Sequence, residues 1–178
     1  MMEELLYSSI DLAAIISSMD LSCREQADFL ERIWENEQPF LWSGYRGNKR
    51  QMILDTSYWL TYFGDKPTID AEFPIIQRDV QETGGELPTE DYTSDYADLD
   101  LFFKSARLRI LYGGGKDYIR LKRRTLMKRY GYKRMSPLLM ERFHRCIYFY
   151  HLQPFVRDRV ECRIEDVDID EVLIFRVV

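Results

Sequence analysis

The chain has 178 residues, of which 46% are hydrophobic and 14% aromatic, so it can bury a core and is not a disordered polar tail. Its three cysteines are an odd number without a Cys-x-x-Cys pair, which argues against a disulfide framework or a zinc ribbon, and we expect no metal or other cofactor. The formal net charge of −5 hides an uneven distribution, because residues 1–106 carry 21 acidic and 8 basic side chains whereas residues 107–178 carry 9 acidic and 17 basic.

The N-terminal part, residues 1–96, is expected to be an acidic helical domain. Apolar side chains on one face predict a first helix over residues 3–19. Ser22 and Glu25 have the spacing of a capping box, in which the serine hydroxyl accepts from the Glu25 amide and the carboxylate reaches back to the Ser22 amide. The helix that they open should end before Pro39.

The same domain is expected to contain a further pair of helices and to end in a linker. Residues 38–48 predict a loop with aromatic anchors, and residues 49–63 predict the third helix. A weaker helix is expected over residues 69–82, where Pro74 would break or restart it. Residues 84–96 are rich in glycine, acidic and hydroxyl side chains and show no apolar periodicity, so they predict the linker between two domains.

The C-terminal part, residues 97–178, is expected to be a basic domain with a different pattern. Its first helix is predicted by five apolar residues at helical spacing, Leu99, Phe102, Phe103, Ala106 and Ile110, and should end at the glycines that begin at residue 113. The pattern then predicts a short strand over residues 118–121 and a helix over 122–130. Ser136 and Pro137 open a further helix that runs to about residue 150. From Val156 apolar and polar residues alternate, residues 163–170 form a polar crossing or a partner strand, and residues 172–178 form a strand.

This order of elements resembles the winged helix-turn-helix module, over roughly the last 80 residues. The resemblance is carried by a helix that ends at a glycine (residues 124–131), a basic turn (132–136), a second helix (137–152) and a terminal strand (168–175). The chain is therefore expected to be a mainly helical α+β protein, with an acidic helical N-terminal part and a winged-helix-like C-terminal part that ends in β-strands.

The resemblance implies that the turn and the later helix face a nucleic acid, while the earlier helix braces them across the backbone. Residues 107–134 hold eleven Lys or Arg and one acid, an excess of one sign that usually has an anionic partner. Carried over, Lys133, Arg134 and Ser136 would bind phosphates at the start of the later helix, and Arg142 and Arg145 would contact the groove. Further phosphate contacts are expected from Lys122, Arg123, Lys128 and Arg129.

Three features keep other interpretations open. The expected wing, residues 165–171, is acidic and would repel a phosphate backbone. The basic run could instead neutralise the acidic half through an internal interface. Arg145 and His151, with five residues between them, resemble the active-site pair of the HEPN ribonucleases, which implies a role at the 2′-hydroxyl and the scissile phosphate.

The leading expectation is a small non-enzymatic nucleic-acid-binding or regulatory protein of bacterial or phage type, with DNA favoured as the ligand. The alternative is a protein-interaction factor, an inhibitor or adaptor that uses the acidic half, and the third is a ribonuclease that uses Arg145 and His151. A homodimer stays open as a further partnership. No membrane contact and a cytoplasmic location are expected, because the apolar stretch over residues 12–16 is too short to span a bilayer and the acidic start differs from a secretory signal.

Overall fold

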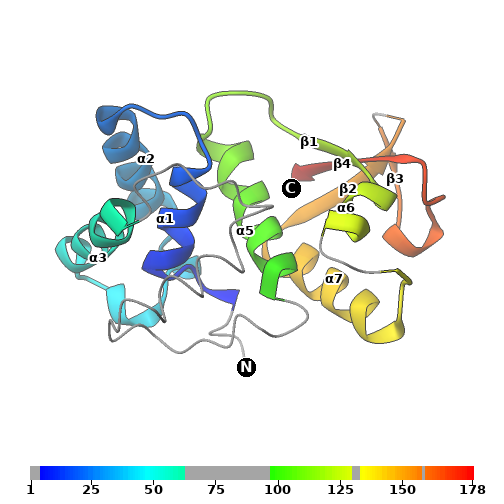
Figure 1. The fold of residues 1–178 in the computed structure, drawn as a ribbon, viewed down its shortest axis with the longest axis horizontal. Helices are drawn as coiled ribbons and strands as arrows, with labels where there is room; N and C mark the ends of the chain where they lie inside the picture. The colour runs from blue at the N-terminus through cyan, green and yellow to red at the C-terminus, as the bar shows by residue number, and fades with distance from the viewer. Residues whose placement is uncertain (1–4, 63–96, 130–132, 158) are drawn as a thin grey trace. The chain divides into compact units, whose positions relative to one another are not determined.

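The computed structural model describes residues 5–62, 97–129, 133–157 and 159–178 (Figure 1). As predicted, the fold is α+β and mainly helical, with an antiparallel sheet near the C-terminus. The chain divides into two compact units, Met1–Ala97 and Asp98–Val178. The helix predicted over residues 69–82 and the linker predicted over residues 84–96 lie outside the described residues.

The first helix corrects the sequence prediction, because α1 spans Ser9–Ser17 and does not reach back to residue 3. Ser8 caps it in a capping box with Asp11, whose carboxylate accepts from the Ser8 amide at 3.0 Å. Just before the cap, Tyr7 forms a parallel bridge with Leu41. The Tyr7 amide donates a hydrogen bond to the Phe40 carbonyl at 2.7 Å, which stabilises this bridge. The apolar residues before Ser8 therefore do not continue the helix.

The other two α-helices in the described part of the first unit follow their predicted bounds closely. The Ser22–Glu25 capping box is confirmed, and it opens α2, Cys23–Asn36, which buries Phe29, Leu30 and Ile33. The expected loop contains two 3₁₀ turns, η2 (Gln38–Phe40) and η3 (Ser43–Tyr45), followed by α3, Lys49–Tyr62. Helices α1 and α3 pack against each other and form the main helical contact of this unit.

The second unit contains a four-stranded antiparallel sheet with the strand order β1-β4-β2-β3. The strands are β1 (Ile119–Lys122), β2 (Leu152–Val156), β3 (Val160–Glu161) and β4 (Val172–Val177). The first and last predicted strands are confirmed. The prediction of alternation from Val156 is wrong at its start, because β2 begins at Leu152, directly after the helix, and residues 164–166 form the 3₁₀ turn η4 (Ile164–Asp166).

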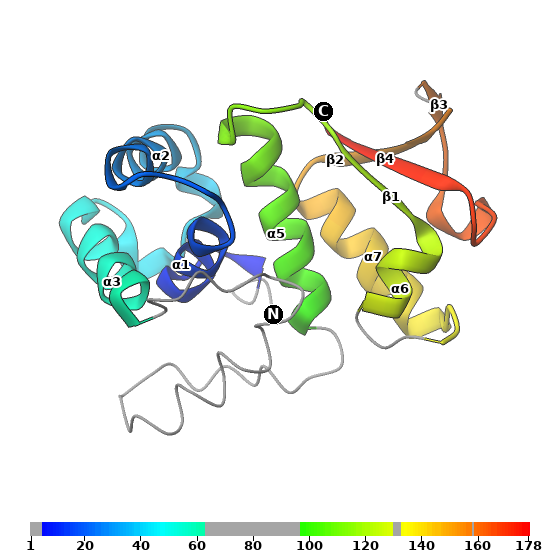
Figure 2. The same cartoon turned by 45° about the horizontal axis from the view of Figure 1, so that its top comes forward.

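Three helices accompany this sheet: α5 (Ala97–Tyr112), α6 (Arg123–Arg129) and α7 (Pro137–Phe149). Figure 2 shows β1, β4 and β2 side by side, with α5 and α7 on the same face of the sheet. The core between them is aromatic: the Phe103 ring meets Phe143 of α7 at 5.8 Å and Phe175 of β4 at 5.7 Å between centroids. Helix α5 ends at the predicted glycines, where Gly114 has a φ of +69° that favours glycine.

Helix α5 is buried on all sides, whereas the sequence predicted one buried face. Every side chain from position 99 to position 108 is buried, including Asp100 at 6%, Lys104 at 3% and Arg107 at 8% exposure. Such polar groups are stable inside a protein only when they are hydrogen-bonded or ion-paired. Arg107 meets this requirement by donating from Nη1 to the Tyr150 carbonyl at 2.8 Å.

Candidate nucleic-acid interface

The exposed cations that the sequence singled out bracket helix α6. Lys122 is the last residue of β1 and immediately precedes α6, while Lys133 and Arg134 lie in the turn that leads to α7. All three side chains are exposed. Lys128 and Arg129 belong to the last turn of α6, and their side chains lie outside the described part of the structure.

Ser136 caps α7 as predicted, and this limits what it can offer a phosphate. Its hydroxyl oxygen accepts from the Leu139 amide at 3.1 Å, and Pro137 occupies the first helical position. With the oxygen engaged as an acceptor, the hydroxyl hydrogen is the group that Ser136 can still donate to an anion. The partial positive charge of the helix N-terminus adds to the charges of Lys133 and Arg134 just before it.

The acidic residues 165–171 are bound to the start of α6 rather than standing apart from it. The Arg123 amide donates to the Glu171 carbonyl at 3.3 Å and the Arg124 amide to the Ile169 carbonyl at 2.8 Å. The Arg123 side chain also contacts this backbone, with Nη1 donating to the Val167 carbonyl at 2.5 Å. Arg123 is therefore a structural anchor of the acidic segment, and we remove it from the expected phosphate contacts.

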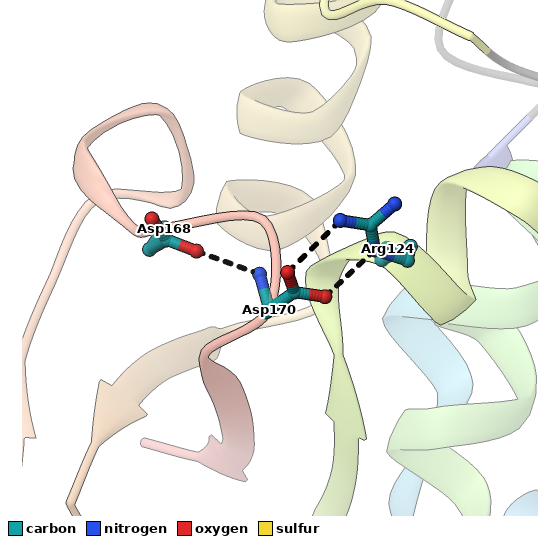
Figure 3. Close-up of polar contacts among 3 residues, drawn as sticks. All are labelled: Arg124, Asp168 and Asp170. Carbon is teal, nitrogen blue, oxygen red and sulfur yellow. Dashed lines mark hydrogen bonds and ion pairs between the residues drawn. The ribbon is translucent and has the colours of Figure 1, made fainter.

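Arg124 holds the same segment through a two-pronged ion pair with Asp170 (Figure 3). Its Nε and Nη2 donate to the two carboxylate oxygens at 2.7 and 2.9 Å, and the Asp170 amide donates to Asp168 Oδ1 at 2.9 Å. The hydrogen bond from Arg124 lowers the pKa of Asp170, and Asp170 in turn raises the pKa of Arg124. The Asp170 carboxylate thus occupies the two parallel N–H donors of the guanidinium, which are the donors that a phosphate would use.

Arg142 does not face outward as the sequence suggested. Its guanidinium pairs with the carboxylate of Asp100 on α5, and the two side chains are only 13% and 9% exposed. The same carboxylate accepts from the Cys146 thiol at 3.0 Å. Burial raises the pKa of Cys146 to about 12, so this thiol stays protonated and donates. We therefore assign Arg142 to the core of the second unit instead of the groove.

The residues of the ribonuclease resemblance lie on different structural elements. Arg145 is part of α7 and is partly exposed. His151 follows the end of the helix in a left-handed conformation, with a φ of 52°, and its carbonyl oxygen accepts from the Val178 amide at 2.8 Å. Arg145 is thus a residue of the helix, and His151 a residue of the turn after it.

Two exposed features of this unit were missed by the sequence interpretation. Arg120 alternates with Lys122 on the exposed face of β1, a position that the two-residue period of a strand could have revealed. On α7, Leu138 and Tyr148 remain 59% and 86% exposed. Tyr148 lies on the side opposite the buried Leu139, Phe143 and Cys146, and Leu138 lies beside that buried face.

The second unit also has an open hollow of about 460 Å³ between the β2–β3 end of the sheet and the acidic segment. Its lining includes Glu161, Asp166, Glu171 and the partly exposed Cys162, whose pKa is raised by burial and then by Glu171. Within the described ranges, no group of three or more His, Cys, Asp and Glu residues is placed to hold a metal ion. Nor does any helix in those ranges combine the length and apolar character needed to cross a membrane.

Comparison with known proteins adds no relative to this description. No protein-family model, no curated protein and no solved structure matches the chain.

Proposed function

We propose that Asp98–Val178 is a winged-helix-like module that binds duplex DNA through a basic ridge, defined here as Lys122, Lys133 and Arg134. The order of helices and strands supports this fold, and so does the sheet order, in which the C-terminal β4 lies between β1 and β2. In such an arrangement the terminal strand completes a small sheet beside the two helices that follow β1. The ridge brackets α6, which is about 10 Å long.

The observation that carries the proposal is the exposure of these three cations within a one-sign segment. Residues 107–134 hold eleven basic side chains and one acid, and a surface of that composition attracts a polyanion. The acidic segment engages Arg123 and Arg124, and Asp100 engages Arg142. The ridge is thus smaller than the sequence suggested, and it lies at the two ends of α6.

The test is a salt-dependent DNA titration followed by fluorescence anisotropy. A labelled 20-base-pair duplex should bind the wild-type chain with an affinity that falls linearly with salt on a log–log plot, by about 0.9 for each phosphate neutralised. The triple variant Lys122→Glu, Lys133→Glu and Arg134→Glu should lower the affinity at least tenfold and reduce the slope by roughly 3.

The matched control reverses three exposed arginines of the first unit, Arg24→Glu, Arg46→Glu and Arg50→Glu. This control changes the net charge by the same amount at exposed sites of the other unit. It should retain most of the wild-type affinity. Equal losses in the two triple variants would show that total charge, and not the ridge, governs binding.

A second candidate function, a protein-interaction factor, is favoured by an observation in the first unit. Leu54 and Tyr58 lie four residues apart on α3 and are 51% and 59% exposed, and Trp42 is 44% exposed. Large exposed apolar side chains at neighbouring positions are typical of protein contact surfaces. A wild-type chain that leaves the duplex unbound at 50 mM salt would favour this function over the first.

A further inference from the structure

Strand β1 forms one edge of the sheet in the second unit, with β4 as its neighbour. In an antiparallel pair, residues that bond to the neighbouring strand alternate with residues whose amide and carbonyl point away from it. The Arg123 amide donates to the Glu171 carbonyl, and these two residues continue the β1–β4 register by one step. Leu121 therefore bonds to β4, whereas Arg120 and Lys122 present backbone groups to the outer edge.

The pairing of β4 with β2 has the same phase and confirms this assignment. The Val178 amide donates to the His151 carbonyl, just beyond the end of the β2–β4 register. Alternation from that bond leaves Pro154 opposite Phe175 at a position without β2–β4 hydrogen bonds, which suits proline because it has no amide hydrogen. The backbone groups of Phe175 therefore point to β1, where its register partner is Ile119.

The outer edge of β1 offers a hydrogen-bond donor and an acceptor side by side. They are the amide and the carbonyl of Arg120, followed by the amide of Lys122, whose carbonyl opens the first turn of α6. Within the described ranges, no residue bonds to these three outward groups. A phosphate supplies acceptors only and leaves the Arg120 carbonyl without a donor, whereas a peptide strand supplies both kinds of group.

The charge of this edge selects the kind of strand that fits it. The side chains of Arg120 and Lys122 lie on the same face of β1, and both are exposed. The hydrogen bond from Arg124 lowers the pKa of Asp170 most, and Lys122 adds a smaller effect, so Lys122 lies near an acid and Arg120 is the stronger anchor. A second copy of the chain that paired through β1 would bring like charges together, which destabilises a sheet.

We propose that the edge of β1 binds an extended acidic segment of a partner protein, which adds to the sheet as a further strand. Because strand side chains alternate, acids at every second position of this segment lie beside Arg120 and Lys122. The residue between them lies beside the partly buried Leu121 and should be apolar. Strand β1 has four residues and is roughly 13 Å long, so we expect weak, reversible binding. This binding is independent of the proposed DNA binding.

The first test titrates the full wild-type chain into a labelled peptide and follows fluorescence anisotropy. The probe is a capped seven-residue peptide in which valine and aspartate alternate. A peptide with the same composition but with its aspartates grouped at one end should bind roughly tenfold more weakly, and an alternating valine–lysine peptide should not bind.

Backbone methylation of the probe tests the strand pairing without any change to the protein. A strand uses only one of its two edges, so one alternate set of peptide nitrogens faces β1 and the other faces water. Methylating the nitrogens of the aspartates or those of the valines should therefore abolish binding in one peptide and preserve it in the other. Equal binding by the two methylated peptides would overturn the proposal.

The second test changes the anchor residue. Arg120→Glu should weaken binding of the valine–aspartate peptide roughly tenfold, with Arg120→Gln between it and the wild type. The matched control Arg159→Glu, at an exposed site just before β3, should bind as the wild type does. No peptide binding by the wild type, equal losses in the two glutamate variants, or a larger loss of duplex DNA than of peptide affinity in Arg120→Glu would each overturn the proposal.

Discussion

At the scale of single residues, the carboxylate of Asp100 organises a buried polar contact between α5 and α7. It accepts from the Cys146 thiol and pairs with Arg142, whose side chain is 13% exposed. Removing one partner of a buried ion pair leaves the other charge uncompensated. We therefore expect Asp100→Ala to reduce the free energy of unfolding by about 3 kcal/mol, as measured by urea denaturation of the full chain.

A double variant distinguishes the cost of the unpaired charge in Asp100→Ala from the cost of lost packing. Replacing both partners with apolar residues, Asp100→Leu with Arg142→Met, removes the charges together and should be much less destabilising than Asp100→Ala alone. If the double variant unfolds at lower urea than the wild type, the ion pair is more stabilising than the apolar pair that replaces it.

The three cysteines should differ sharply in reactivity because only the thiolate reacts. Burial raises the pKa of Cys146 to about 12, so it should resist iodoacetamide at pH 8 in the folded protein. Cys23 is exposed and should be alkylated first, with the partly exposed Cys162 between them because burial and nearby acids raise its pKa. Peptide mass spectrometry over time measures the order, and alkylation of Cys146 as fast as that of Cys23 would contradict it.

At the scale of elements, the acidic segment and α6 form one structural unit. Asp170 occupies the fork of Arg124, a planar group that suits a phosphate. We expect Asp170→Asn to raise DNA affinity several-fold, because the neutral amide competes less well for the guanidinium and one repulsive charge is lost. Anisotropy at 50 mM salt measures the change.

The control for this prediction is Asp28→Asn, which makes the same change in charge at an exposed site on α2. It should leave the affinity near that of the wild type. An affinity that is unchanged in Asp170→Asn would show that Arg124 takes no part in binding.

Elements whose stability is set locally could be predicted from the sequence, and those set by distant contacts could not. The caps at Ser22 and Ser136 depend on residues within three positions, and the hydrogen bonds are present as expected. Arg142 was misassigned because its partner Asp100 lies on another helix and 42 positions earlier. The start of α1 was misplaced for a similar reason, since Tyr7 is held in an extended conformation by Phe40 and Trp42.

The candidate site shows the same division. The exposure of Lys133 and Arg134 follows from a turn that the sequence indicates directly, whereas Lys122 was expected to begin a helix and instead ends β1. The engagement of Arg123 and Arg124 depends on how residues 165–171 fold back against α6, more than 40 positions away. Charge counts along the chain therefore overestimate the basic surface, because they do not show which cations already have carboxylate or carbonyl partners.

At the scale of the whole molecule, most of the acidic excess is confined to one part of the sequence. Residues 63–96 contain nine acidic and two basic side chains, whereas residues 107–134 contain one acid and eleven bases. A segment with that net charge repels DNA and competes with phosphates for the same cations. Changing Glu82, Glu86, Glu90 and Asp91 to their amides should therefore raise DNA affinity several-fold at 50 mM salt, as measured by anisotropy.

The salt dependence of this gain identifies its cause. The Debye length shortens from roughly 10 Å at 0.1 M salt to about 3 Å at 1 M, so charges without a direct contact cease to influence binding as salt rises. A gain that disappears by 0.3 M salt reflects long-range repulsion. A gain that persists reflects direct occupation of the basic ridge by these carboxylates, and in that case the triple ridge variant should abolish it. No gain at 50 mM salt would contradict both explanations and would separate the acidic part of the chain from DNA binding.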